Sequence, residues 1–213
     1  MNGLLATILS LALFFPTTLV AHAQAAPAPF QPNQATINGS GQQAVPLPLA
    51  QGAFKMDATY QGPANFIVTL LDGTGQPVGL LANTIGAYKG SQFQNVPVSG
   101  NYVLQVQASG PWTMTLQDYV TWPSGQPVGA PLTGHGPAAL AVQLNAGLAT
   151  FSMSHDGQRN FIVTPMDSAA NPIGLLANTI GPFTGSQAAN IASSGVYLFN
   201  IEADGNWVLG ITQ

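Results

Sequence analysis

The sequence contains no cysteine and very few charged residues. Without cysteine the chain cannot form disulfides, thiolate metal sites or a thiol nucleophile, and a lipid-modified N-terminal cysteine is excluded too. Only 5% of the residues are charged, against about 25% in an average soluble domain. The polar surface must therefore come from Gln, Asn, Ser and Thr. Such a surface gives little repulsion between molecules, which favours adhesion or assembly.

Positive charge is especially scarce. The chain has 3 Lys and Arg against 7 Asp and Glu, for a formal net charge of −4, and the cations are Lys55, Lys89 and Arg159. Binding to nucleic acid requires clustered Lys and Arg that displace counterions from phosphates. Three scattered cations cannot supply such a surface, so nucleic acid is excluded as a partner. No cofactor or metal ion is expected from the residues present.

Residues 1–23 are predicted to be a secretory signal peptide. An apolar run from Leu4 to Val20 precedes Ala21-His22-Ala23, the small-x-small pattern of a cleavage site. No Lys or Arg precedes the run, which departs from the usual pattern. The alternative is an uncleaved membrane anchor, but Pro16 interrupts the run and a span needs about 20 apolar residues. Both interpretations predict a secreted, periplasmic or cell-surface protein.

The remaining sequence is organised by a tandem duplication. The string Gly79–Gly86 (GLLANTIG) recurs letter for letter as Gly174–Gly181, 95 residues later. With that offset and no gap, 31 of 80 positions from Asn38 to Gln117 are identical to their counterparts. We therefore expect two modules, residues 38–117 and 133–213. They are preceded by a leader rich in Pro, Ala and Gln (24–37) and joined by a Pro-rich linker (118–132). Tyr119 and Trp122 of the linker are expected to dock on a face of one module.

Each module has the pattern of an all-β domain. Short runs of alternating or β-branched residues are interrupted about every 8–12 residues by Gly, Pro, Asn or Asp, and no helical period is sustained. One apolar face on each strand predicts two tandem antiparallel β-sandwich modules of jelly-roll-like layout. In the first module the expected strands are Gln43–Leu49, Ala53–Tyr60, Asn65–Leu71, Val78–Ala82, Gln94–Val98, Asn101–Ala108 and Trp112–Gln117.

Two residue types shared by the copies have alternative interpretations. Asp72 and Asp167 are the only acidic residues common to both, and a calcium site needs several oxygen ligands, so we expect them to cap turns. Trp112 and Trp207 could stack on sugars if exposed. Their phase with neighbouring apolar residues predicts burial in the sandwich core instead.

The repeated string supplies the candidate binding site. One interpretation is structural: its glycines and leucines shape the fold, and Asn83 and Thr84 hold a loop by hydrogen bonds to its backbone. The other is functional, with one polar patch per module suited to hydroxyl-rich ligands or to a partner's backbone. The patches would comprise Asn83, Thr84, Ser91 and Gln92 in the first module, and Asn178, Thr179, Ser186 and Gln187 in the second.

Catalysis is not expected. No His, Glu, Lys or Arg is shared by the two copies, whereas general acid–base chemistry uses paired titratable groups. Ser154, His155 and Asp156 are adjacent in the second copy. Neighbouring residues on a strand point to opposite faces, so these three cannot converge as a triad.

The final half of each module contains a Gly-x-Tyr strand, in Ser99–Val106 (SGNYVLQV) and Ser194–Ile201 (SGVYLFNI). This strand resembles the small exported β-sandwich modules of bacterial and archaeal secreted proteins, of which the prepeptidase C-terminal type is the best known. The Asn-Thr-Ile-Gly and Ala-x-Gly-x-Trp signatures look more like an uncharacterised exported domain. The resemblance implies a non-catalytic surface, targeting or binding module.

Together these features predict a secreted or cell-surface binding protein without catalytic activity. Its expected partners are extracellular polysaccharides or surface proteins, engaged by both patches at once. A self-assembling subunit of a surface layer or fibre is the alternative, since low charge and duplicated strand edges favour self-association. A hydrolase is the third and least favoured class.

Overall fold

The computed structural model describes residues 35–118 and 125–213, which form strands connected by turns and loops. The predicted signal peptide and the docking of Tyr119 and Trp122 lie outside the described residues. No helix in the described ranges is long and apolar enough to cross a membrane. The first module contains the strands β1 (Ala35–Ser40), β2 (Gln43–Leu49), β3 (Gly52–Tyr60), β4 (Asn65–Leu71), β5 (Pro77–Ile85), β6 (Tyr88–Val96), β7 (Gly100–Gln107) and β8 (Pro111–Asp118).

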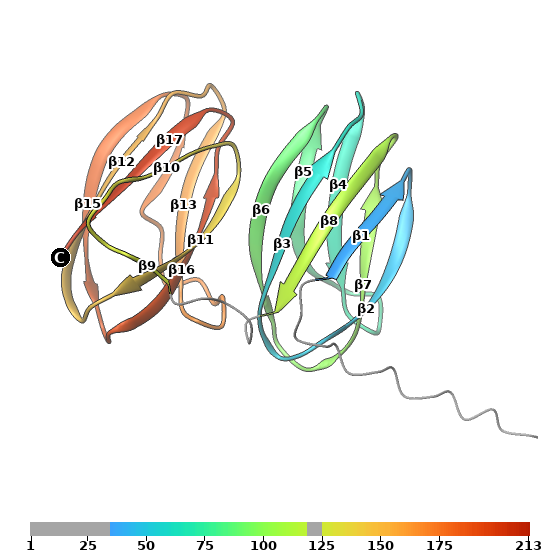
Figure 1. The fold of residues 1–213 in the computed structure, drawn as a ribbon, viewed down its shortest axis with the longest axis horizontal. Helices are drawn as coiled ribbons and strands as arrows, with labels where there is room; N and C mark the ends of the chain where they lie inside the picture. Colours follow the sequence, from blue (N-terminus) through green and yellow to red (C-terminus); the bar gives the residue numbers. More distant parts are fainter. Residues whose placement is uncertain (1–34, 119–124) are drawn as a thin grey trace, which may run out of the picture.

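The second module repeats this plan. Its strands are β9 (Gln126–Pro127), β10 (Leu132–His135), β11 (Ala138–Leu144), β12 (Gly147–His155), β13 (Asn160–Met166), β14 (Ala177–Ile180), β15 (Phe183–Ile191), β16 (Gly195–Glu202) and β17 (Asn206–Thr212). Figure 1 shows the two modules as separate sandwiches that stand side by side. The prediction of two tandem all-β sandwiches is confirmed.

Each sandwich is made of two sheets with equivalent strand orders. In the first module the sheets run β1-β8-β3-β6 and β2-β7-β4-β5. In the second they run β10-β17-β12-β15 and β14-β13-β16-β11-β9. All described pairings are antiparallel except that of β9 with β11, which is parallel. The repeated string therefore lies at a sheet edge in both copies, on β5 and on β14.

Alternating side chains build the cores as the sequence predicts. In β7, Tyr102, Leu104 and Val106 are buried, whereas the residues between them are exposed or half-buried. A period of two places one face of the strand inside the sandwich and the other outside. Trp112 and Trp207 are also buried, and their indole N–H groups donate to the carbonyls of Gly41 and Gly136. The prediction that both tryptophans close the cores is correct.

Several strand predictions were incomplete. β1 and β10 were not expected; β1 includes residues 35–37, which the sequence assigned to the leader, and pairs with β8. β6 covers Tyr88–Val96 and not the predicted Gln94–Val98. These are edge strands, where one side of the backbone has no neighbour in the sheet. Polar residues and glycines are tolerated there, so the alternating pattern that marks inner strands is weak.

The repeated string adopts different structures in the two modules. In the first it belongs to the nine-residue strand β5, so the expected loop around Asn83 and Thr84 is wrong. In the second, only Ala177–Ile180 is a strand. The difference arises on the partner strand, where Pro165 occupies the position of Leu70. Proline has no backbone N–H to donate to the ladder, so the pairing of β13 with β14 stops at Val163.

Hydrogen bonds between side chains and backbone groups join the two modules at a junction. β6, an edge strand of the first module, lies across the β11–β16 face of the second (Figure 1). The side chain of Asn200 clamps the backbone of Phe93: its Oδ1 accepts from the N–H at 2.8 Å and its Nδ2 donates to the carbonyl at 2.9 Å. Asn95 donates to the carbonyl of Ala169, and the hydroxyl of Ser91 accepts from the N–H of Ala139. The edge of β6 is thereby covered.

Apolar packing surrounds this clamp. The buried cluster at the junction comprises Ala53 and Phe93 of the first module with Ala139, Met166, Ala170 and Leu198 of the second. Ala170 is 2% exposed and has a φ of 61°, which is unfavourable for a side chain with a Cβ. Its counterpart is Gly75, around which a Cβ would meet no atom. The strain at Ala170 is offset by the burial of its methyl group in the junction.

The shared aspartates cap turns, as predicted. Oδ1 of Asp72 accepts hydrogen bonds from the N–H groups of Thr74 and Gln76 and from the Thr74 hydroxyl. Oδ1 of Asp167 accepts from the N–H groups of Ala169 and Asn171. The hydroxyl of Thr74 and then the N–H of Gln76 lower the pKa of Asp72. Burial raises the pKa of Asp167, but the hydrogen bonds from Asn171 and Ala169 outweigh it and leave that pKa lowered too.

The double substitution Asp72→Asn with Asp167→Asn should flatten the acid limb of stability. A carboxylate with a depressed pKa stabilises the fold above its ordinary pKa of 3.8, and this contribution is lost as the pH falls through the depressed value. The variant should melt below the wild type near neutral pH. The gap should close as the pH falls below about 3.8. Melting temperatures followed by circular dichroism against pH would check this, and a constant gap would contradict it.

Candidate functional site

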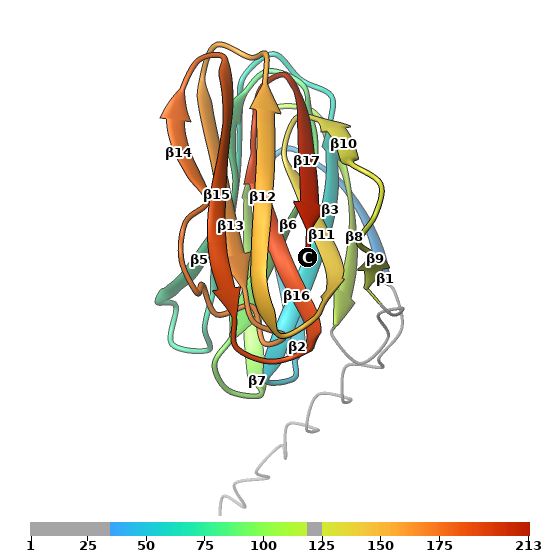
Figure 2. The same cartoon turned by 90° about the vertical axis from the view of Figure 1, so that its left-hand side faces the viewer.

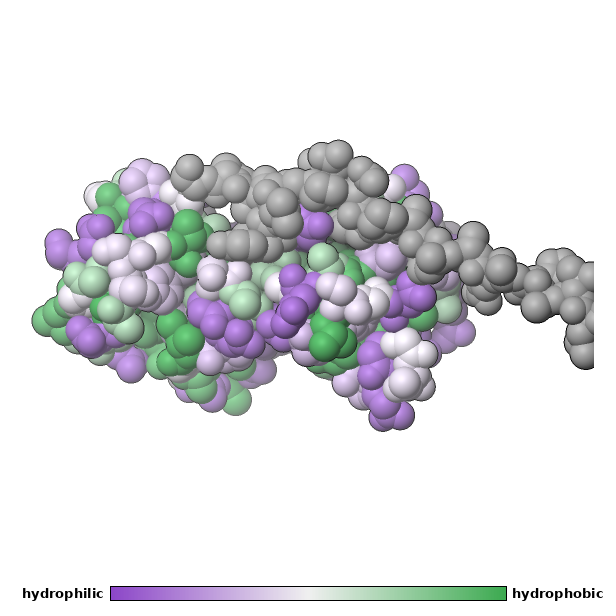
Figure 3. Space-filling view, turned by 90° about the horizontal axis from the view of Figure 1, so that it is seen from below, coloured by the Kyte–Doolittle hydropathy of each residue, from purple (hydrophilic) through white to green (hydrophobic). Residues whose placement is uncertain are grey.

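The junction leaves a cleft of about 920 Å³ between the modules. β5 and the start of β6 form one wall, and the loops around residues 135–137, 158–160 and 202–204 of the second module form the other. Figure 2 shows β5, β14 and β15 toward one side of the molecule. Figure 3, seen from below, shows polar and apolar residues interspersed over both modules. The residues that line the cleft thus come from both modules.

Polar side chains in the cleft are uncommitted. Asn83, Thr84 and Gln92 line it from the first module, and Asn160 lines it from the second. Within the described ranges none of these four side chains has a hydrogen-bond partner. Amides and hydroxyls placed this way can both donate and accept. They are suited to a ligand rich in hydroxyl groups.

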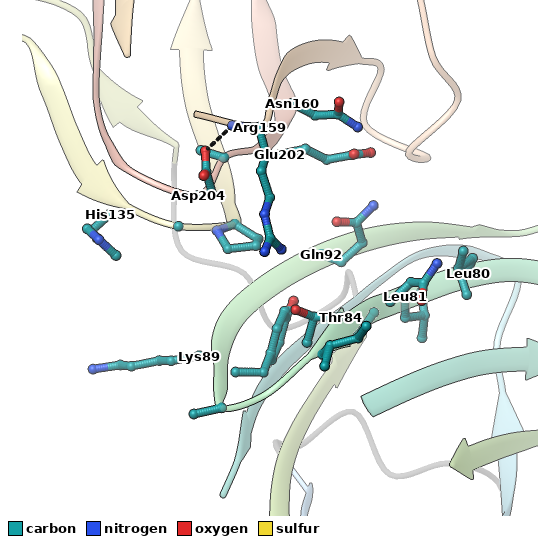
Figure 4. A pocket seen from close by; sticks show the side chains of 18 of the residues that line it. Leu80, Leu81, Thr84, Lys89, Gln92, His135, Arg159, Asn160, Glu202 and Asp204 are labelled. Atoms are coloured by element: carbon teal, nitrogen blue, oxygen red, sulfur yellow. Dashed lines mark hydrogen bonds between the residues drawn. The ribbon is translucent and has the colours of Figure 1, made fainter. Parts of the chain in front are cut away.

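Two of the three cations meet at this cleft. Lys89 comes from β6 and Arg159 from the β12–β13 loop (Figure 4). The third cation, Lys55, lies 2.9 Å from Asp57 and is ion-paired. Neither Lys89 nor Arg159 forms an ion pair within the described part of the chain. The chain thus concentrates its unpaired positive charge at the cleft.

Two carboxylates also line the cleft, and they differ in their hydrogen bonds. Asp204 accepts hydrogen bonds from the N–H groups of Gln158 and Arg159, both at 3.1 Å. Burial raises the pKa of Asp204, but these hydrogen bonds outweigh it and leave the pKa lowered, so the carboxylate is ionised at neutral pH. Glu202 makes no such bonds among the described residues and is exposed. Glu202 is therefore the carboxylate available to a ligand.

Tyr88 also lines the cleft, and its hydroxyl is neutral. Burial raises its pKa to about 12, and the nearby charges of Asp57 and Glu202 add to the shift. Its ring packs tilted against Phe66 of the first core. Tyr88 thus contributes a neutral hydroxyl to the lining of the cleft.

Exposed aliphatic side chains complete the lining. Leu80 is 53% exposed, Ile85 73% and Ile180 76%. Ile85 and Ile180 occupy the same place in the repeated string, and both reach the same cleft. The two copies of the string therefore contribute to one site.

The structure separates the eight predicted binding residues. Asn83, Thr84 and Gln92 line the cleft, whereas Ser91 is used in the junction. Their counterparts lie elsewhere, on the edge strands of the second module: Asn178, Thr179, Ser186 and Gln187. The two patches are not equivalent.

Comparison of the copies missed the residues that differ between them. Lys89, His135, Arg159, Glu202 and Asp204 line the cleft, but each has a different residue type at its counterpart. A search for shared residues assumes two identical sites. A composite site draws different residues from each module, and only the scarcity of cations could have pointed to Lys89 and Arg159.

The adjacent Ser154, His155 and Asp156 do not form a triad. The His155 ring lies inside the second module, stacked on Phe161 with centroids 4.7 Å apart, and its Nδ1 is 3.2 Å from the carbonyl oxygen of Gly181. Asp156 is bound to Asn206, which lowers its pKa. No group of three or more potential metal ligands occurs among the residues described.

No family model and no curated protein sequence matches the chain. Among solved structures, it is similar to the M60 catalytic domain with two CBM51 domains of Clostridium perfringens ZmpB, at 6% identity and a TM-score of 0.32. That alignment covers 83% of this chain and 34% of the other. The exported protein XepA of PBSX matches at 9% identity and a TM-score of 0.31, covering 87% and 88%. The CBM22 tandem of Paenibacillus barcinonensis Xyn10C matches at 10% identity and 0.27, covering 83% and 86%.

Proposed function

We propose that the chain is a secreted or cell-surface binding protein without catalytic activity, and that it holds a polysaccharide in the cleft between its modules. The observation that carries this proposal is the set of uncommitted amides and hydroxyls that line the cleft from both sides. Such groups exchange hydrogen bonds with sugar hydroxyls at little cost, because they give up only water on binding.

The exposed aliphatic residues add a second contribution. Leu80, Ile85 and Ile180 can cover the apolar faces of sugar rings, since burying apolar surface contributes about 25 cal/mol per Å². The buried tryptophans cannot serve this purpose. Because each module provides one wall, a single module should bind poorly.

The internal repeat provides a matched control for this proposal. Asn83→Ala with Gln92→Ala should weaken polysaccharide binding about tenfold or more, since each lost hydrogen bond contributes about 1 kcal/mol. The melting temperature should change little, because neither side chain has an internal partner. The same change 95 residues later, Asn178→Ala with Gln187→Ala, should leave the affinity unchanged. Calorimetry with the chain lacking residues 1–23, against a panel of envelope polysaccharides, provides the measurement.

Two outcomes would contradict the proposal. Equal losses in both variants would indicate two independent patches in place of a composite cleft. A large fall in melting temperature with Asn83→Ala and Gln92→Ala would show that these residues are scaffold. Sedimentation at several concentrations should accompany the titration, since assembly without saturable binding would favour a structural subunit.

A further inference from the structure

We infer that the polysaccharide bound in the cleft is acidic, with sugar units that carry carboxylates. This inference rests on the proposed function and adds the chemical class of the ligand. It starts from the placement of Lys89 and Arg159, which are unpaired within the described residues and come from different modules. Of the chain's three cations, the two that form no ion pair within the described residues both line the cleft, which also contains the carboxylates of Glu202 and Asp204.

The arrangement of the charges fits a carboxylated sugar. Figure 4 shows Arg159 extending from the second module into the cleft, with Lys89 and His135 drawn at one end. A guanidinium matches the geometry of a carboxylate and can bind it through two parallel hydrogen bonds. An ammonium supplies a second point of attraction. The two cations, one from each module, can therefore each attract a carboxylate of the polymer.

The other end of the cleft is suited to hydroxyl groups. Gln92, Asn160 and Glu202 are drawn there in Figure 4. The amides can donate or accept, and the carboxylate oxygens of Glu202 can accept a hydrogen bond from a hydroxyl group. A ligand with one carboxylate and several hydroxyls on each ring satisfies both ends.

Within the described residues, neither carboxylate of the cleft forms an ion pair with Lys89 or Arg159. Asp204 is committed to the N–H groups of the loop that carries Arg159, and its carboxylate is 3.4 Å from Nε2 of the buried His155. It therefore holds the loop in place and leaves the guanidinium unpaired. Glu202 is the other carboxylate of the cleft, and it is drawn beside Asn160 and Gln92 in Figure 4.

Polygalacturonate and its methyl ester test the inference, since esterification removes the charge and keeps the hydroxyls. The chain lacking residues 1–23 should bind the acid about tenfold more tightly than the ester, because a hydrogen bond to a charged group contributes more than a neutral one. Lys89→Gln and Arg159→Gln should each reduce affinity for the acid about tenfold and affinity for the ester by a smaller factor. Lys55→Gln, which removes a paired cation, is the control and should have no effect. Added salt should weaken only the binding of the acid.

Each result separates the inference from the proposed function. Equal affinity for acid and ester, lost in Asn83→Ala with Gln92→Ala, would overturn the acidic ligand and retain the binding cleft. Binding of neither polymer, together with no binding to any polysaccharide of the panel, would overturn both. Tighter binding of dextran sulfate than of polygalacturonate would overturn the assignment to carboxylates.

Discussion

Trp207→Ala is expected to lower the free energy of unfolding by about 3–5 kcal/mol. The side chain is 3% exposed, and its indole N–H donates to the Gly136 carbonyl at 2.9 Å. The ring also lies directly over Gly134, where a Cβ would overlap it. Truncation therefore opens a cavity and leaves a buried carbonyl without its donor. Urea unfolding followed by circular dichroism measures the loss.

The first module predicts the same result independently. Trp112 lies over Gly39 and donates to Gly41, so Trp112→Ala should cost a similar amount. Leu148→Ala is the control, because this side chain is 69% exposed and exposed substitutions change stability by about 0.5 kcal/mol or less. A change below about 1 kcal/mol in either tryptophan variant would show that the indole is not a core residue.

Asn200→Ala is expected to uncouple the two modules. It removes both buried hydrogen bonds to the backbone of Phe93, at a cost of about 2–4 kcal/mol. When the modules separate, water can hydrate the backbone N–H and carbonyl of Phe93. The variant should therefore populate arrangements in which the two modules are apart. Small-angle scattering should show a larger radius of gyration. Polysaccharide affinity should fall as well, because the two walls of the cleft no longer hold a fixed separation.

The 95-residue repeat again offers the control. Gln105 is the counterpart of Asn200 and is exposed on β7, so Gln105→Ala should change neither scattering nor affinity. Unchanged scattering in Asn200→Ala would mean that the apolar cluster around Phe93 and the hydrogen bonds of Ser91 and Asn95 hold the modules without this clamp. Unchanged affinity in a variant whose scattering has expanded would contradict the composite cleft.

The sequence predicted the inner strands well because burial on one face imposes a period of two. The inner strand β4 was predicted to the residue, as Asn65–Leu71, and the inner strand β3 to within one residue, as Ala53–Tyr60 against Gly52–Tyr60. The tryptophans were placed correctly by their phase with Met114 and Leu209. Edge strands such as β6 carry no such period, since their residues serve the junction and the cleft.

The candidate site was predictable only in part. Asn83, Thr84 and Gln92 were identified because both copies share them. Lys89 and Arg159 were not, because a contact between two non-equivalent surfaces selects different residues on each. Relative placement of the modules depends on single contacts, such as Asn200 with Phe93, that leave no pattern along the chain.

The clamp at Phe93 also determines whether this arrangement can propagate. A head-to-tail contact builds an open filament only if both complementary surfaces recur at the free ends. The counterpart of Phe93 is Ala188 on β15 and that of Asn200 is Gln105 on β7, so neither the phenylalanine nor the asparagine of the junction is repeated. The contact that joins these two modules is therefore not repeated on β15 or β7, and the same contact cannot add a further copy head to tail.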